Sequence, residues 1–394
     1  MASLFAVGPT PAPGAELGIL PIREYLLVGL TAAAVTFLLT GLVRLVAIRM
    51  GAVATPRERD VHVTPIPRLG GLAMYLGVLA GMLLANHLPV LRSAFEFSWD
   101  AVAVLGAGAL IVVVGALDDR FDLDAVTKLA GQVTAAGVLV LFGVQWFLFW
   151  VPWGGDGSPG GSIGSVLLLG QDQAVLLTVL MTVVLTNAMN FVDGLDGLAA
   201  GIGLIAAASI GAFSLGQLDS RGSVDSYPPV LIAATLAGAC LGFLPHNFQP
   251  ARIFMGDSGS MLIGLMLAAA TTSASGRVET RSTGPSDTLA LLSPLLVVAA
   301  VLFVPMLDLV LAVLRRTRAG LHPFHPDKMH LHHRLLEIGH SQRRAVLLVY
   351  LWAALLAFGA VALTMLDAFV VAWALSLGLL LALLASVVPR LRAP

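Results

Sequence analysis

Three aspartates follow one of the long apolar stretches of the chain. Asp118 and Asp119 come directly after Leu117, and Asp122 lies three and four residues beyond them. In a helix this spacing places Asp122 beside both of the others. Three carboxylates so close repel one another and need a cation. Such oxygen ligands suit Mg²⁺, which proteins typically bind through one or two carboxylates together with substrate phosphates. The alternative is a solvated acidic loop at a helix end.

A second segment has a polar side chain at every third position. It consists of Asn187, Asn190, Asp193 and Asp196, with Gly194 and Gly197 after the two aspartates. Neighbours at this spacing share a helix face, and the glycines let the backbone approach a ligand closely. Amides and carboxylates together can read sugar hydroxyls or the edge of a base. Polar contacts between membrane helices are the alternative, which suits the asparagines better than two aspartates at a helix break.

A third motif, Gly256-Asp257-Ser258-Gly259-Ser260, resembles the nucleophile strand of trypsin-like serine proteases. We reject that interpretation, because the protease needs a histidine base and a buried aspartate on β-barrels, whereas this motif opens an apolar helix. At a helix N-terminus, free backbone N–H groups with Ser258 and Ser260 form an anion site, and Asp257 is suited to a metal that bridges the same anion. Simple N-capping by Asp257 or Ser258 is compatible with this function.

Residues 321–340 hold six of the nine histidines and are flanked by arginines. The six are His322, His325, His330, His332, His333 and His340. A zinc site is one hypothesis, but no thiol or acid pair completes a familiar spacing, and the arginines would repel a dication. A cationic loop that binds phosphates and lies against anionic headgroups fits the charge better. A loop that is basic only because it faces the cytoplasm explains the arginines but not the crowded histidines.

Long apolar segments separate these motifs. The chain has 394 residues, of which 58% are hydrophobic and 11% charged, whereas roughly 25% are charged in a soluble protein. About 20 apolar residues suffice to cross a bilayer. We expect eleven such spans, near residues 25–46, 69–88, 100–117, 126–146, 173–191, 197–217, 229–246, 259–275, 288–312, 345–365 and 368–388. The sequence therefore predicts an all-α polytopic membrane protein, one membrane-embedded domain over residues 1–394, with no nucleic-acid partner.

The basic residues predict the orientation. If the N-terminal segment 1–24 lies outside, 17 of the 22 Arg and Lys residues fall on the inner side, so the C-terminus is cytoplasmic by the positive-inside rule. Residues 1–24 lack the features of a signal peptide, and we expect the first span to be retained. All the polar motifs then lie at inner loops, namely residues 47–68, 118–125, 192–196, 247–258 and 313–344.

A cation-coupled transporter is the rival class of protein. Transporters place their binding groups near the bilayer midplane and often consist of repeated halves. Here the acids lie at the inner helix ends, and no internal repeat is visible. The single cysteine, Cys240, excludes an intramolecular disulfide and a thiolate metal cluster. An enzyme with one cytoplasmic site explains the pattern better than a transporter.

In this order and at these helix ends, the four motifs resemble those of the polyprenyl-phosphate N-acetylhexosamine-1-phosphate transferases, the family of the WecA/TagO type and of MraY. The resemblance extends from about Arg57 to Arg344. MraY-type enzymes carry three consecutive histidines followed by an aromatic residue and an acid. Here the stretch from Pro326 to Leu335 reads PDKMHLHHRL, which is similar to the branch that uses UDP-N-acetylglucosamine (UDP-GlcNAc). The sequence of this loop through Gly339-His340-Ser341 most resembles that of decaprenyl-phosphate GlcNAc-1-phosphate transferases.

The resemblance implies an enzyme of the bacterial plasma membrane whose active site faces the cytoplasm, and it also implies the reaction. UDP-GlcNAc and a polyprenyl phosphate (undecaprenyl or decaprenyl) give polyprenyl-diphospho-GlcNAc and UMP, with Mg²⁺ or Mn²⁺, as the first membrane step of cell-wall or surface glycopolymer synthesis. An MraY-type phospho-MurNAc-pentapeptide transferase is the alternative. Membrane lipids are further partners, and a homodimer is plausible for the family.

The resemblance also implies roles for individual residues. The acids expected at the catalytic centre are Asp118, Asp119, Asp122 and Asp257. Of these, Asp257 and Asp119 would bind the metal, and Asp118 would contact the lipid phosphate. The substrate-binding residues would be Asn187, Asn190, Asp193, Asp196 and Ser258, with Asn247 and Phe254 at the uracil and His330, His332, His333 and Arg334 at the diphosphate or sugar.

Overall fold

The computed structural model describes residues 20–54, 65–96, 98–151, 165–221, 227–275, 296–300, 302–303, 317–318 and 340–387. Within these residues, seven helices are long and apolar enough to cross a membrane. They are α1 (Ile22–Met50), α4 (Asp100–Phe121), α6 (Gln171–Val192), α7 (Leu198–Arg221), α8 (Tyr227–Asn247), α12 (Gln342–Met365) and α13 (Ala368–Val387). The protein is therefore mostly helical, as expected for a polytopic membrane protein.

Other helices complete the bundle. They are α2 (Gly70–Ala85), the short α3 (Ser93–Glu96), α5 (Ala125–Leu141) and α9 (Gly256–Ser275). Ten of the eleven expected spans each coincide with one helix. The remaining one, residues 288–312, lies mostly outside the described residues.

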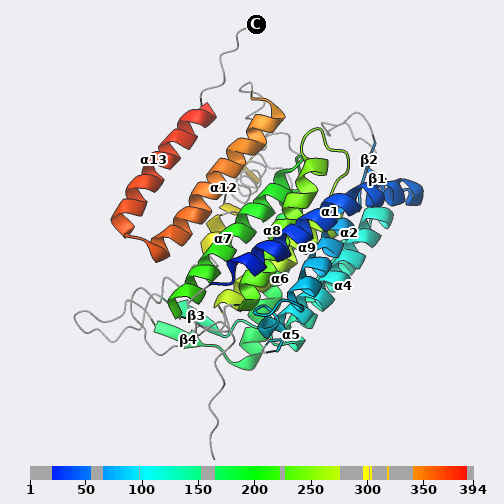
Figure 1. Ribbon diagram of the computed structural model, residues 1–394. Helices are drawn as coiled ribbons and strands as arrows, with labels where there is room; N and C mark the ends of the chain where they lie inside the picture. Colours follow the sequence, from blue (N-terminus) through cyan, green and yellow to red (C-terminus); the bar gives the residue numbers. More distant parts are fainter. Residues whose placement is uncertain are drawn as a thin grey trace, which may run out of the picture.

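Two short antiparallel hairpins correct the all-α prediction. Strands β1 (Val53–Ala54) and β2 (Ile66–Pro67) pair at one end of the bundle, and β3 (Leu148–Val151) pairs with β4 (Ser165–Leu168) at the other (Figure 1). In β3 and β4, aromatic and branched apolar residues flank the glycine-rich segment 153–164, and such residues favour paired strands. Hydropathy over long windows does not resolve strands of two to four residues.

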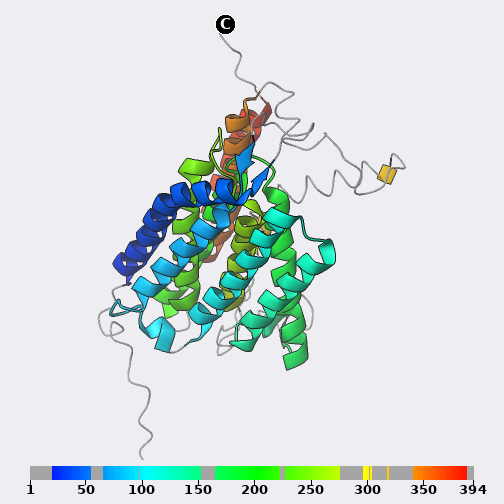
Figure 2. The same cartoon turned by 90° about the vertical axis from the view of Figure 1, so that its right-hand side faces the viewer.

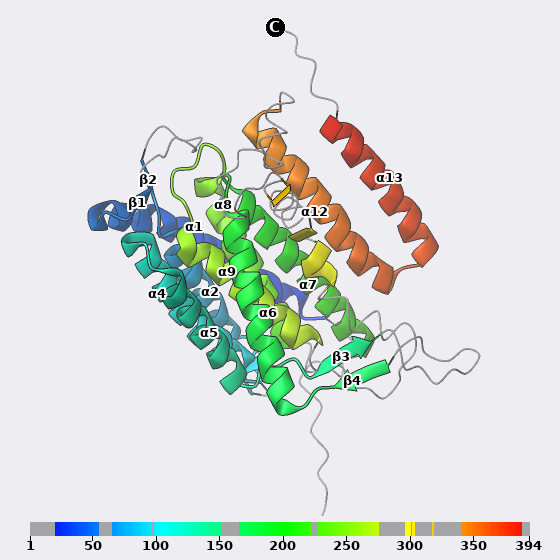
Figure 3. The ribbon, with the colours of Figure 1, turned by 180° about the vertical axis from the view of Figure 1, so that it is seen from behind.

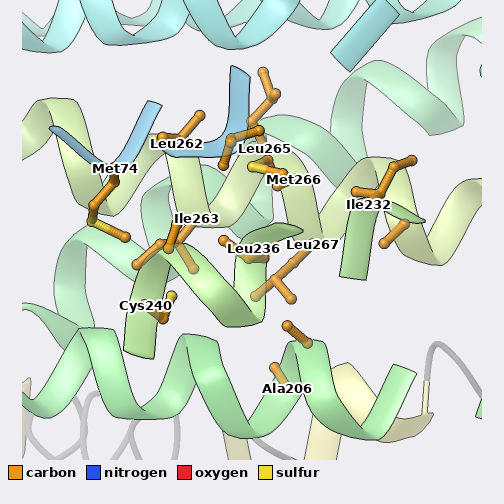
Figure 4. Packing of buried hydrophobic residues seen from close by; sticks show 14 of the residues in the cluster. Met74, Ala206, Ile232, Leu236, Cys240, Leu262, Ile263, Leu265, Met266 and Leu267 are labelled. Carbon is orange, nitrogen blue, oxygen red and sulfur yellow. The ribbon is translucent and has the colours of Figure 1, made fainter. Parts of the chain in front are cut away.

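Helix α9 lies at the centre of the bundle. It packs against α2, α4, α6, α7 and α8, and all of its residues except Asp257 and Ala274 are buried. Figure 4 shows Leu262, Ile263 and Leu267 of α9 among side chains from the surrounding helices. A helix that is apolar on every side needs neighbours all round. This central position fixes the first turn of α9, which carries the Asp257 motif.

The remaining helices surround this core. Helices α1, α2, α4, α5 and α6 lie side by side across one face (Figure 2). At the other edge α12 packs against α7, and α13 packs against α12 on its outer side (Figures 1 and 3). Helix α13 exposes most of its apolar surface, including Phe369, Trp373 and Leu377. Such a surface suits contact with lipid, which cannot hydrogen-bond a backbone and therefore favours a continuous helix.

Candidate active site

The carboxylate of Asp119, in the last turn of α4, meets the start of α9. Its Oδ1 accepts a hydrogen bond from the backbone N–H of Asp257 at 2.9 Å, and its Oδ2 accepts the N–H of Ser258 at 3.3 Å and the hydroxyl of Ser258 at 3.0 Å. The first N–H groups of a helix have no partner within it and attract negative charge. Asp119 itself therefore occupies the anion site that the sequence predicted at this helix N-terminus.

Two glycines make this approach geometrically possible. Gly256 has φ +69° and a Cβ there would overlap the Asp119 carboxylate, while a Cβ on Gly115 would overlap the backbone of Ser258. A left-handed backbone is accessible to glycine at little cost. Helix α4 can therefore lie directly against the first turn of α9.

The side chain of Asp257 is held by two polar groups from other helices. Asn190 on α6 donates its amide to Oδ1 at 2.9 Å, and the ammonium of Lys128 on α5 pairs with Oδ2. Lys128 also pairs with Oδ2 of Asp118 at 3.1 Å, and the backbone N–H of Leu123 donates to the other oxygen of Asp118 at 2.9 Å. A single lysine thus joins two of the predicted catalytic acids.

Sequence reasoning missed Lys128 as a site residue. It lies in the first turn of α5, whose N-terminus is capped by Asp124 through hydrogen bonds from the N–H groups of Val126 and Thr127, both at 3.0 Å. The short connection between α4 and α5 returns the chain to Asp118. One signal was available, because the chain contains only two lysines and one of them begins an apolar helix.

The two asparagines of the second motif have different surroundings. Asn190 also donates to the hydroxyl of Ser260 at 3.0 Å. Asn187 exchanges hydrogen bonds with Gln132 of α5, at 2.7 and 3.4 Å. Asn187 therefore joins two helices, which is the polar-contact alternative, whereas Asn190 belongs to the group around Asp257. Gln132 is a second residue that the sequence did not single out.

Asp193 caps the end of α6 and lies in a partly buried, acidic environment. Burial, reinforced by the carboxylates of Asp119 and Asp196, raises the pKa of Asp193 to about 7, and the guanidinium of Arg68 opposes this rise. The structure therefore brings Asp119, Asp193 and Arg68 into one electrostatic environment. Arg68, directly after β2, belongs to the inner loop 47–68 that the sequence predicted at the active site.

Asp196 and Asn247 hold backbone around the site. Asp196 is buried, and its Oδ2 accepts the N–H of Ala251 at 2.9 Å. Asn247 is also buried; its Oδ1 accepts the N–H of Gly197 and its Nδ2 donates to the carbonyl of Ile253, both at 3.1 Å. Both ends of this amide are thus used internally. The predicted contact of Asn247 with the uracil remains a prediction.

Phe254 lies in the loop that joins α8 to α9. Its backbone N–H donates to the carbonyl of Pro67 at 2.9 Å, and its carbonyl accepts the N–H of Gly70 at 3.1 Å. These bonds fix the loop against β2 and the start of α2. The partly buried Phe254 ring is therefore attached to a well-anchored backbone next to the Asp257 motif.

The helical spacing expected for Asp122 relative to Asp118 and Asp119 is wrong, whereas its role at the catalytic centre stays a prediction. Helix α4 ends at Phe121, and Asp122 adopts a left-handed conformation with φ 50° and is exposed. The helical spacing therefore does not continue through the third aspartate. His330, His332, His333 and Arg334 lie outside the described residues.

The donors of the site fit a divalent cation that is completed by its substrate. In the described part of the chain, no three His, Cys, Asp or Glu side chains are placed to hold a metal by themselves. Mg²⁺ commonly takes only one or two carboxylates and completes its shell with phosphates and water. The Asp257 carboxylate, which pairs with the ammonium of Lys128, is one such donor.

Comparison with known proteins adds independent evidence. Residues 101–275 match the model of "Glycosyl transferase family 4". The chain is 56% identical to the decaprenyl-phosphate N-acetylglucosaminephosphotransferase of Mycolicibacterium smegmatis over 373 residues, covering 94% of this chain and 90% of that one. It is 60% identical over 341 residues to the protein of that name from Mycobacterium tuberculosis H37Rv (86% and 82%). It is 35% identical over 326 residues to a probable undecaprenyl-phosphate N-acetylglucosaminyl 1-phosphate transferase of Bacillus subtilis (83% and 81%).

Proposed function

The chain belongs to glycosyl transferase family 4, together with the polyprenyl-phosphate N-acetylglucosamine-1-phosphate transferases, and we propose that it transfers GlcNAc-1-phosphate from UDP-GlcNAc to a polyprenyl phosphate. The products are polyprenyl-diphospho-GlcNAc and UMP. The names of the relatives that are 56–60% identical support decaprenyl phosphate as the acceptor. They also favour UDP-GlcNAc over the MurNAc-pentapeptide donor of the MraY type.

One observation carries the proposal. Lys128, Asn190 and the first turn of α9 meet at Asp257, so cationic and amide donors lie beside carboxylates at a single helix end. Both reactants are anionic, and transfer of a phosphoryl group depends mainly on positioning and on neutralising charge. This arrangement supplies both, and a site at a helix end admits a lipid carrier from the membrane.

The reaction can be written with the residues of this chain. An oxygen of the lipid phosphate attacks the β-phosphorus of UDP-GlcNAc, the bond from that phosphorus to the bridging oxygen breaks, and UMP leaves with that oxygen. A phosphate monoester is already largely ionised near neutral pH, since its second pKa is about 6, so no residue has to remove its proton. Lys128 and Arg68 neutralise phosphate charge, and Asn190 orients Asp257.

We propose Mg²⁺ or Mn²⁺ as the cofactor, held by Asp257. The ion supplies Lewis-acid stabilisation of the diphosphate. Asp119 remains the predicted second ligand, although both its oxygens already accept hydrogen bonds from α9. A dication at Asp257 would compete with Lys128 for this carboxylate, so we expect the lysine to move away from Asp257 when the metal binds.

We also propose the topology. The ten helices that match expected spans, together with residues 288–312, support eleven crossings with the N-terminus outside and the C-terminus in the cytoplasm. The active site then faces the cytoplasm at the inner surface of a bacterial plasma membrane, where UDP-GlcNAc is available. A homodimer stays a prediction.

The experiment is UMP release by the purified protein in liposomes. Release should require both a polyprenyl phosphate and Mg²⁺ with UDP-GlcNAc as donor, and UDP-MurNAc-pentapeptide should not replace this donor. Preference for the pentapeptide donor would place the protein in the MraY branch. Movement of solute across the liposome without consumption of UDP-sugar would instead indicate a transporter.

A further inference from the structure

The turn that carries Asp193 and Asp196 ends at a glycine held by side chains from two other helices. The N–H of Gly197 donates to Oδ1 of Asn247, on α8, at 3.1 Å. The carbonyl of Gly197 accepts the hydroxyl of Tyr350, on α12. The same carbonyl also accepts the N–H of Gly201, in the first turn of α7, at 3.0 Å. Each backbone polar group of Gly197 therefore has a side-chain partner on another helix, and the Tyr350 hydroxyl adds to the local bond at the carbonyl.

The ring of Tyr350 fits against α7 because small residues leave room for it. A Cβ on Gly201 would overlap the ring. Gly197 has φ +79°, and a Cβ there would lie 2.9 Å from the Phe248 ring and 3.4 Å from the Tyr350 hydroxyl. Two glycines one turn apart thus leave the space that the Tyr350 ring occupies, and a side chain at either position would displace the ring.

Helix α12 reaches a second loop of the site from its first turn. The Nε of Arg343 donates to the carbonyl of Gln249 at 2.9 Å, and the Gln249 amide donates to Gln342 at 2.6 Å. Gln249 belongs to the loop that leads to Phe254. The first three turns of α12 therefore hold both loops that we assign to the nucleotide sugar.

We infer that Tyr350 is a positioning residue for the nucleotide-sugar pocket. Its hydroxyl fixes Gly197, and Gly197 fixes the direction in which the chain leaves Asp193 and Asp196. Tyr350 acts through the backbone. The choice of substrate in this inference rests on the proposed function, whereas the restraint on the turn does not.

The test compares two substitutions that each remove one hydroxyl from a backbone carbonyl. Tyr350→Phe should raise the KM for UDP-GlcNAc about tenfold, the order expected for one buried hydrogen bond, with the KM for polyprenyl phosphate and kcat nearly unchanged. It should also speed amide hydrogen exchange in residues 193–201. Tyr25→Phe is the matched control, because the Tyr25 hydroxyl donates to the carbonyl of Tyr227 at 3.3 Å. Tyr227 begins α8, about 30 Å along this helix from Asn247 at its other end. Tyr25→Phe should change none of these quantities.

A second variant tests the contact between the Tyr350 ring and Gly201. Gly201→Ala should raise the KM for UDP-GlcNAc. The free-energy change of the double variant Gly201→Ala/Tyr350→Phe should be smaller than the sum of the two single changes, because both substitutions act on one contact. Unchanged exchange in residues 193–201 of Tyr350→Phe would overturn the inference, as would an equal rise in KM for both substrates. If the wild-type protein transferred nothing from UDP-GlcNAc, the proposed function would fail, while hydrogen exchange would still decide whether Tyr350 restrains the turn.

Discussion

Replacement of Lys128 by methionine removes the positive charge of the lysine that pairs with both Asp118 and Asp257. Methionine keeps much of the length of the side chain, so the change is mainly one of charge. The side chains of Lys128, Asp118 and Asp257 are 20%, 14% and 25% exposed. The free energy of such partly buried pairs is intermediate between that of exposed ion pairs, about 0–1 kcal/mol, and that of buried pairs, whose disruption costs about 3–5 kcal/mol.

We therefore assign about 1–2 kcal/mol to each of the two pairs, or about 2–4 kcal/mol together. If this energy organises the site for transfer, kcat/KM falls about 30- to 1000-fold, because each 1.4 kcal/mol is a factor of ten. Removing the competing ammonium should also lower the Mg²⁺ concentration needed for half-maximal rate. UMP release measured against Mg²⁺ and both substrates gives each quantity.

Lys128→Arg is the matched control, since it keeps the charge and should retain more activity than the methionine variant. A Lys128→Met protein that inserts normally and keeps kcat/KM within about threefold of wild type, less than 1 kcal/mol by the same conversion, would contradict this role of Lys128. It would mean that the ammonium only fills space between the acids in the absence of substrate.

Three further predictions concern other residues of the site. Asp257→Asn should fold and insert but lose most transfer activity, because the side chain keeps its size and loses its charge; near-normal turnover at saturating Mg²⁺ would rule out the metal assignment. Because the pKa of Asp193 is raised from 3.8 to about 7, the folded protein binds this proton more tightly than the unfolded chain. Stability should thus fall as pH rises from about 4 to about 7; Asp193→Asn should reduce this fall in thermal denaturation, and identical pH profiles would contradict the assignment. His332→Ala should weaken catalysis without loss of expression, and restoration of its activity by zinc in place of magnesium would favour a zinc site.

The helices were largely predictable because membrane spans have a strong local signal. A continuous apolar run must satisfy its backbone internally, and only a helix does so within one segment. The expected span 100–117 became α4, and 173–191 became α6, each with small shifts at the ends. The two hairpins were missed because their strands are short and depend on pairing between distant residues.

The site was only partly predictable because its contacts join helices far apart in sequence. Residue type and helix ends predict Asp119 and Asp257 as site residues, but they do not predict the contact of these two residues across 138 positions. The helix was expected to include Asp122, and a left-handed residue ended it instead. Lys128 entered the site only through the return of α5 beside α4. The contacts of Asp119 and Lys128 depend on how α4 packs against α5 and α9, and spacing along the chain does not show this packing.

In the proposed reaction, the sugar leaves the nucleotide with one phosphate attached. The most direct test of this reaction supplies UDP-GlcNAc labelled with ³²P at the β-phosphate, together with a polyprenyl phosphate and Mg²⁺, and follows the label between the lipid and aqueous phases. We predict that the label moves to the lipid as unlabelled UMP appears. Label retained in released UDP would show transfer of the sugar alone and would contradict the proposed reaction.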